Sequence, residues 1–113
     1  MKYITSLLTF LLFSSFALSQ TQLGADIDGE AAGDYLGWSV SMSSDGSRLA
    51  IGAPGNDSNS GHVRVYEYAN NAWTQLGADI DGEAANNSSG YSVSMSSDGS
   101  RLAIGATRND GNG

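Results

Sequence analysis

The sequence predicts an all-β fold built from repeated four-stranded antiparallel sheets. Residues 21–60 and 74–113 align with an offset of 53 residues, and 31 of the 40 aligned positions are identical. Short runs that alternate apolar and small polar residues are separated by glycine-rich turns, and no helical period follows residue 20. Four short strands in each repeat of this length are the pattern of β-propeller blades.

The first repeat contains one complete set of four expected strands. They are residues 37–42, 48–53, 62–68 and 73–76. Asp45-Gly46 lies between the first two runs and predicts a tight hairpin turn, because such turns need a positive φ. Ala50 and Gly52 are small residues on one face of the second run, which favours the close approach of a neighbouring sheet. Residues 54–61 are rich in Gly, Asn, Asp and Ser and predict a loop.

The second repeat supplies only its first two expected strands, residues 91–95 and 101–106, after a polar stretch at 77–89. Thr21–Leu23 is expected to be a lone fourth strand before the first repeat. Copy one therefore spans 21–73 and a truncated copy two spans 74–113, about one and three-quarter blades. Because propeller rings typically hold four to eight blades, this is an incomplete ring. We expect a piece of a longer repeat protein, or a short chain that needs self-association to complete its fold.

Residues 1–19 have the layout of a signal peptide. Met1–Lys2 is a short positive start, Ile4–Leu18 is an uncharged apolar and hydroxylic run, and Ala17-Leu18-Ser19 is a small-x-small triplet. The run is shorter than the roughly 20 apolar residues that cross a bilayer. We therefore expect a signal peptide helix at 1–19, a mature domain at 20–113, a secreted or cell-surface location and no stable membrane span.

The charge of the chain argues against anionic partners. The net charge is −7, and cleavage after residue 19 would remove the only lysine and leave −8. Such a surface repels phosphate backbones, so we expect no nucleic-acid binding. The sequence also has no cysteine. Disulfides therefore cannot stabilise this small domain, and strand packing, bound metal or further repeats must do so.

Three motifs of the first repeat resemble the FG-GAP repeat family, the blades of integrin α-chain-like propellers. They are Leu36–Val40, Ile51–Pro54 and Gly61–Tyr66. The second copy repeats the first motif at Gly90–Val93 but has Thr107 in place of the proline. The resemblance covers nearly all of residues 21–113, and it implies propeller blades that serve recognition or adhesion. WD repeats are the alternative, but Tyr66-Glu67 stands where that family has Trp-Asp, and the 53-residue period is long for it.

The family resemblance implies a non-catalytic, secreted or cell-surface propeller segment for protein or carbohydrate recognition. Two alternatives stay open at the level of the sequence. The chain could be the propeller portion of a larger secreted enzyme whose catalytic part lies elsewhere, or a purely structural repeat array. We do not expect an enzyme, because the sequence has no nucleophile-elbow motif and no cysteine or histidine metal set.

Acidic side chains gather in the lead-in to each repeat and are the metal candidates. They are Asp26, Asp28 and Glu30 in copy one, and Asp79, Asp81 and Glu83 in copy two. Oxygen ligands spaced two apart around a glycine could hold Ca²⁺, but the full EF-type spacing is missing, and a solvated acidic loop is the commoner meaning of such a partial match. The calcium loop of integrin-type blades does not transfer to Asp45 or Asp98. Each of these turns has one carboxylate, and Ca²⁺ takes six to eight oxygens.

His62 and the large aromatic residues complete the candidates. His62 is the only histidine and has no acidic or nucleophilic partner nearby in the sequence, so we expect no catalytic role for it. The large aromatic residues could form a binding platform, although packing between blades is the commoner role of such rings; they are Trp38, Tyr66, Tyr68, Trp73 and Tyr91.

Overall fold

The computed structural model describes residues 20–109. The predicted signal peptide, residues 1–19, and residues 110–113 lie outside this part of the chain, so the signal peptide stays a prediction. Within residues 20–109, no helix has the length and apolar character needed to cross a membrane.

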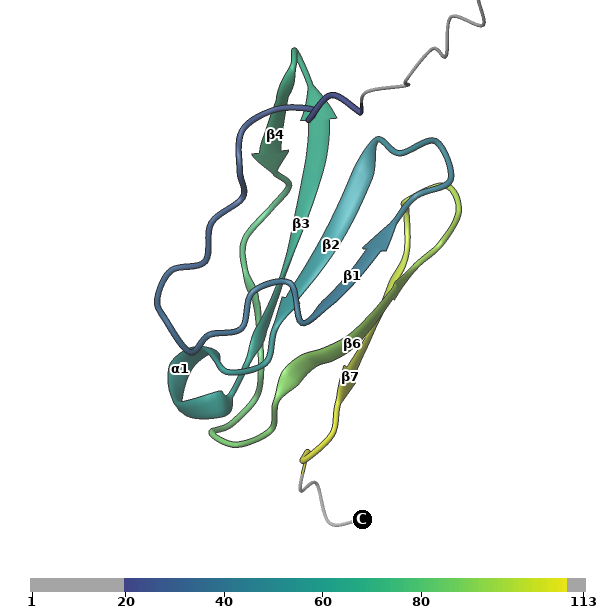
Figure 1. Cartoon of the computed structure of the whole chain (residues 1–113). Coiled ribbons are helices and arrows are strands. Elements are labelled where there is room, and N and C mark those ends of the chain that lie inside the picture. Colours follow the sequence, from purple (N-terminus) through teal and green to yellow (C-terminus); the bar gives the residue numbers. More distant parts are fainter. Residues whose placement is uncertain (1–19, 110–113) are drawn as a thin grey trace, which may run out of the picture.

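Copy one folds as one antiparallel sheet, as the sequence predicts. Its four strands follow each other in the order β1 (Ser39–Met42), β2 (Arg48–Ala53), β3 (His62–Ala69) and β4 (Ala72–Gln75) (Figure 1). All neighbouring pairs are antiparallel. A two-residue strand, β5 (Ile80–Asp81), also pairs with β3. This meander is the predicted four-stranded blade.

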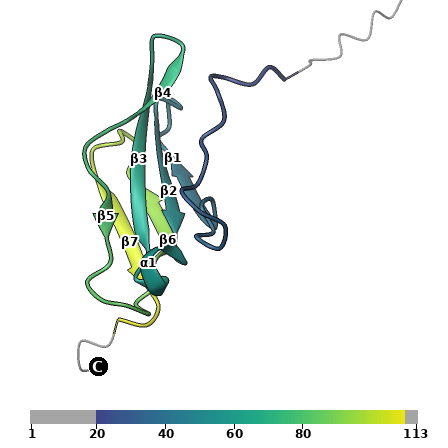
Figure 2. The ribbon, with the colours of Figure 1, turned by 90° about the vertical axis from the view of Figure 1, so that its left-hand side faces the viewer.

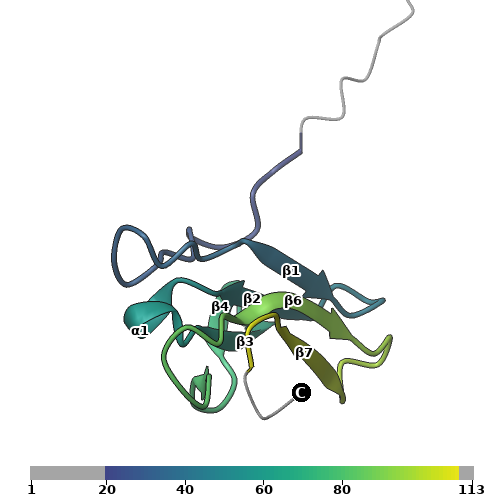
Figure 3. The same ribbon diagram turned by 90° about the horizontal axis from the view of Figure 1, so that it is seen from below.

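Copy two contributes a hairpin that packs against this sheet. β6 (Ser89–Met95) and β7 (Leu102–Ala106) pair antiparallel and form a second, two-stranded sheet. Seen from below, β6 lies next to β1 and overlaps β2, and β7 lies on the far side of β6 from β1 (Figure 3). The two sheets of residues 20–109 stack face to face and do not close a ring.

The face of the first sheet that meets the second carries small residues. Ser39 pairs with Gly52 and Ser41 with Ala50, so these four residues lie on one face of the sheet. Ala50 is fully buried, and a Cβ on Gly52 would collide with the Gly90 carbonyl of β6. The predicted role of Ala50 and Gly52 in close approach is confirmed.

The lead-in segment, residues 20–38, covers the opposite face of the first sheet. Figure 2 shows it to the right of β1 and β2, with β7 to the left. Trp73 Nε1 donates a hydrogen bond to the Leu23 carbonyl over 3.0 Å, and Arg64 of β3 pairs with Glu30. Ile51 and Tyr66 are buried in the first sheet. The core therefore lies in the first sheet, between the lead-in segment and the second copy.

Four local predictions need correction. Thr21–Leu23 is not a strand, because no described strand runs beside it and its contact is the indole of Trp73. The loop at 54–61 contains one helical turn, α1 (Asn56–Asn59), although Asp57 and Ser58 lie in the left-handed region. The stretch at 77–89 contains β5, which at two residues is too short to leave a pattern. The strand at 91–95 begins earlier, at Ser89, where its register shifts.

Candidate functional site

An open cavity lies at the end of the molecule where the loops of both copies meet. Its volume is about 380 Å³, within the range of small-molecule sites. Tyr35, Trp38 and Tyr91 give it an aromatic wall. The Trp38 ring centroid lies 6.0 Å from that of Tyr35 and 5.4 Å from that of Tyr91. Nine residues line the cavity: Tyr35, Trp38, Pro54, Gly55, Asn59, Ser88, Tyr91, Thr107 and Arg108.

The aromatic wall is largely open to solvent. Tyr35 is 61% exposed, Trp38 54% and Tyr91 45%. The expectation of packing between blades is right for the contact of Trp38 with Tyr91, which joins the two copies, whereas Tyr35 was not among the aromatic candidates that the sequence offered. Tyr68 and Trp73 pack differently, within the β3–β4 hairpin, at 5.1 Å. The cavity rings thus keep large accessible faces that a ligand could cover.

Tyr35 stands in a backbone conformation that a bulky residue rarely adopts. Its φ is 56°, in the left-handed region, and the equivalent residue of copy two, Ser88, has a φ of 55°. Left-handed geometry costs a residue with a Cβ roughly 1–2 kcal/mol. Tyr35 and Ser88 therefore share this φ, and only copy one places an aromatic ring there.

The cavity is lined by the positions at which the two copies differ. Eight of its nine lining residues form four aligned pairs, and the members of each pair differ: Tyr35 and Ser88, Trp38 and Tyr91, Pro54 and Thr107, Gly55 and Arg108. The hairpins that carry these loops have identical sequences in the two copies, residues 39–53 and 92–106. Identical hairpins thus carry differing residues in their flanking loops and, at Tyr91, near the start of β6, and positions of this kind on a rigid scaffold often carry binding.

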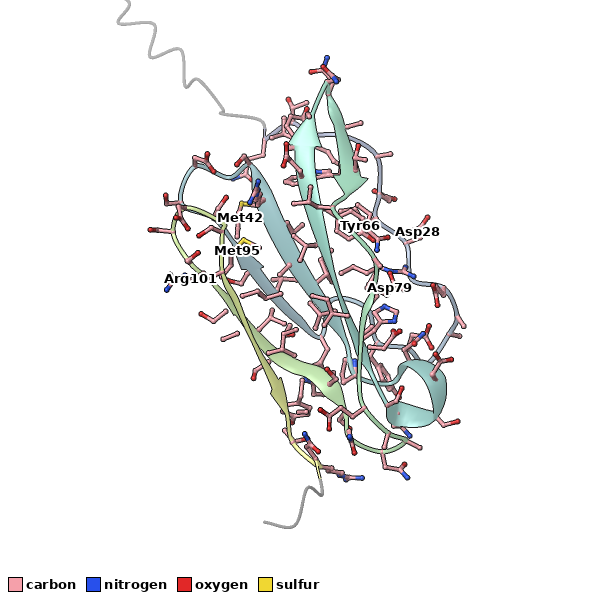
Figure 4. All side chains as sticks on the ribbon, turned by 180° about the vertical axis from the view of Figure 1, so that it is seen from behind. Asp28, Met42, Tyr66, Asp79, Met95 and Arg101 are labelled. Carbon is pink, nitrogen blue, oxygen red and sulfur yellow. The ribbon has the colours of Figure 1, made fainter. Side chains whose placement is uncertain are left out.

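The acidic residues of the first lead-in do not gather around one point. Asp26 Oδ1 accepts a hydrogen bond from Gln22 Nε2 over 2.7 Å, and Glu30 pairs with Arg64. Asp28 lies at the periphery of the molecule (Figure 4). In the second lead-in, Glu83 makes no ion pair with any residue that the structure describes.

Asp79 is tied to Arg64. Arg64 Nε donates to Asp79 Oδ1 over 2.8 Å and Arg64 Nη2 to Asp79 Oδ2 over 2.7 Å, while Gln75 Nε2 adds a third bond of 2.6 Å to Oδ1. The hydrogen bonds from Arg64 lower the pKa of Asp79 to about 2, and the same pairing raises the pKa of Arg64. Asp79 is therefore ionised at neutral pH.

His62 lies opposite an acidic residue that its sequence neighbourhood does not reveal. β5 places Asp81 directly opposite His62 in the register of β3. One imidazole nitrogen and one carboxylate oxygen from each of Asp79 and Asp81 lie within 4.8 Å of one another. The sequence offered Asp79 and Asp81 as metal candidates but left His62 out. The alternation of β3 could have placed His62 on the face of Arg64, but nothing in the sequence marks β5.

Asp45 and Asp98 act as turn residues. Asp45 Oδ1 accepts hydrogen bonds from the backbone N–H and the hydroxyl of Ser47, at 3.0 and 2.8 Å, and from the Ser43 hydroxyl at 2.8 Å. Asp98 repeats this pattern with the two equivalent serines. The backbone hydrogen bond from Ser47 is the largest cause that lowers the pKa of Asp45 to about 2, and Ser100 acts likewise on Asp98. The turn prediction is confirmed.

The sequence of copy one identifies the repeat. Residues 20–66, from the lead-in through most of β3, match the family model of the FG-GAP repeat. This segment is similar to an FG-GAP repeat. This confirms the resemblance over the WD alternative, and it fits the antiparallel blade of β1 to β4. FG-GAP repeats are typically extracellular or surface domains and are often protein-interaction modules. No curated protein and no solved structure matches this chain.

Proposed function

We propose that this FG-GAP chain is a non-catalytic recognition module that binds carbohydrate in the cavity lined by Tyr35, Trp38 and Tyr91. The observation that carries the proposal is the division between identical hairpins and differing loops. Eight of nine cavity residues come from positions at which the copies differ. A cavity formed only by the stacking of repeats would not need this difference.

The chemistry of the cavity suits a sugar ring. A pyranose has a C–H face that can lie on an exposed aromatic ring, and hydroxyl groups at its edge that need polar partners. Trp38 and Tyr91 offer such rings, while Asn59, Ser88 and Arg108 offer donors and acceptors at the rim. This combination of apolar surface with a few polar groups is typical of small-ligand sites.

The proposal extends to location and role. A secreted or cell-surface module with this site would serve adhesion to glycans. The predicted signal peptide and the family of the repeat support that location. Recognition of a protein is the second candidate, and the frequent use of FG-GAP repeats as protein-interaction modules favours it.

The test is calorimetric titration of the purified chain with a panel of neutral oligosaccharides. We expect Trp38→Ala to weaken binding about 30-fold, since truncating an aromatic anchor costs about 2 kcal/mol. Tyr35→Ser places the residue of copy two on the same backbone, so it should weaken binding without loss of stability. Val40→Ala, equally exposed on β1 but outside the cavity, is the matched control and should bind as the parent does.

Two results would contradict the carbohydrate proposal. One is equal affinity of the parent and Trp38→Ala for every sugar that binds. The other is no measurable binding to any sugar of the panel, together with a protein ligand whose affinity falls in Trp38→Ala. That second result would show that the cavity recognises a protein.

A further inference from the structure

The buried imidazole of His62 has a ring nitrogen whose hydrogen-bonding capacity no described protein group satisfies. Its side chain is 2% exposed, and Nε2 is buried without any hydrogen-bond partner. A buried polar atom without a partner costs roughly 1–3 kcal/mol, and such atoms are rare in folded proteins. His62 is also the largest fully buried side chain of the described residues. A bound group that uses the imidazole nitrogen would remove this cost.

The side chains around His62 are those that bind a metal ion. Asp81 faces His62 across the β3–β5 pair, and Asp79 precedes β5 by one residue. One ligand atom from each of the three residues lies within 4.8 Å of the other two. A tetrahedral ion with ligands at about 2.0–2.1 Å needs them about 3.3 Å apart. Asp81 is exposed, so its side chain can rotate to shorten these separations.

Arg64 does not prevent a cation from binding here. The two bonds from Arg64 and the one from Gln75 occupy three of the roughly four lone-pair directions of the Asp79 carboxylate, which leaves one on Oδ2. Glu30, Asp79 and Asp81 carry three negative charges around the one positive charge of Arg64. The carboxylates thus exceed the charge of Arg64 by two, which matches a divalent cation.

We propose that His62, Asp79 and Asp81 form a binding site for a divalent transition-metal ion, of which Zn²⁺ is the representative. One imidazole nitrogen and two carboxylate oxygens are a ligand set that zinc accepts, with a fourth position open to water. Ca²⁺ and Mg²⁺ prefer sets made of oxygen alone, so they should bind more weakly. The ion would clamp β5 and the link from β4 onto the end of β3 that lies beside α1.

The other repeat supplies a matched control. Asp26 and Asp28 are the aligned equivalents of Asp79 and Asp81. Among residues 20–109 the only histidine is His62, and the metal-like group contains neither Asp26 nor Asp28. Asp28→Asn therefore removes the same carboxylate from the same local sequence without touching the proposed site.

The experiment is titration of the metal-free full chain with ZnCl₂, followed by calorimetry and by thermal unfolding. We expect one Zn²⁺ per chain and a rise in the unfolding temperature with zinc concentration. Asp81→Asn, at an exposed position, should weaken zinc binding about 10- to 100-fold or more, since even outer partners of a metal ligand contribute that much. His62→Gln should do the same, and Asp28→Asn should bind as the parent does.

Substitution of Co²⁺ for Zn²⁺ gives a readout that a purely structural role of His62 would not change. The parent should show the visible absorption of four-coordinate cobalt, and Asp81→Asn should lose it. The proposal is overturned if the parent binds no zinc up to millimolar concentration, or if Asp28→Asn weakens binding as much as Asp81→Asn. Equal affinity for Ca²⁺ and Zn²⁺ would also overturn it, because the imidazole would then not be a ligand.

Discussion

The two copies carry the same residues in different surroundings. In copy one, Ser39, Ala50 and Gly52 face the second copy and are half-buried or buried. On the outer face of the β6–β7 hairpin, the equivalents Ser92 and Ala103 are exposed, and the third equivalent, Gly105, is half-buried. One sequence thus serves as an interface in one place and as surface in the other. Burial in this protein is set by the neighbouring repeat and not by local pattern.

The contacts between the copies show how this interface is built. Ser39 Oγ donates to the Gly90 carbonyl over 2.7 Å, and Arg48 Nη1 donates to the Gly99 carbonyl over 2.9 Å. Ser44 N donates to the carbonyl of Ser97, its own equivalent, over 2.8 Å. Met42 and Met95 lie near each other at the ends of β1 and β6 (Figure 4). The same donors are present on copy two, so its exposed face offers what a further repeat would need.

The largest expected difference between the copies is at their matched glycines. Gly52→Ala should destabilise the fold by about 3 kcal/mol, because its Cβ would collide with the backbone carbonyl of Gly90. Gly105→Ala meets only Ser92, whose side chain can rotate, so we expect a change within about 1 kcal/mol. Urea unfolding of both variants measures the difference. Equal losses at the two positions would mean that the copies do not pack as described.

A smaller difference is expected at the matched serines. Ser39→Ala removes the donor to the part-buried Gly90 carbonyl and should cost about 1–2 kcal/mol in the free energy of unfolding. Ser92→Ala is at an exposed position, where we expect less than about 0.5 kcal/mol. The comparison is made by thermal unfolding of the two single variants and the double variant. A cost at Ser92 as large as at Ser39 would contradict the asymmetry.

A still smaller difference in stability is expected between variants of the two equivalent glutamates, Glu30 and Glu83. Glu30→Gln breaks the ion pair with Arg64, but half of the Glu30 side chain is exposed, so solvent weakens the pair to about 0.5–1 kcal/mol. Glu83→Gln has no described ion pair to lose and should leave stability unchanged. Added salt should shrink the effect at Glu30. If salt leaves that effect unchanged, the pair is not the cause.

At the turns the copies should not differ. Asp45 and Asp98 make the same hydrogen bonds, and each pKa is lowered from 3.8 to about 2. A lowered pKa stabilises the fold above the unfolded value, and this contribution is lost as the pH falls from about 4 to about 2. Carboxyl NMR titration should show two nearly coincident midpoints. Clearly separated midpoints would show that the turns lie in different surroundings.

The sequence predicted the strands within each repeat well, but it did not predict the contacts between segments that are distant in the sequence. The period of two and the Asp45-Gly46 turn located β1 and β2, and β2 falls on the predicted bounds. The apolar residues of β1, Val40 and Met42, are half exposed or more, and the serine face meets the second copy instead. Alternation shows that a strand has two faces, but it does not say which face a neighbour covers.

The candidate site residues were likewise predictable where they depend on local sequence, and not where they depend on contacts between distant segments. The sequence named Asp79 and Asp81, and it marked Trp38 and Tyr91, but not Tyr35, as platform candidates. It could not show that β5 brings Asp81 opposite His62, because that pairing joins residues nineteen apart through a two-residue strand. Nor could it show that the differing loop positions of both copies line one cavity, since that depends on how the repeats stack.

Residue-resolved amide hydrogen exchange of the dilute chain tests the central claim most directly. Ile51 and Ile104 occupy the same register position, opposite Val40 and Val93, but β2 lies between two strands and β7 has only β6 beside it. We predict that the amides of β2 exchange about tenfold more slowly, or slower still, than those of β7, because β2 is hydrogen-bonded on both sides and covered by the second copy, whereas β7 is an edge strand. Equal exchange rates in β2 and β7 would contradict the account.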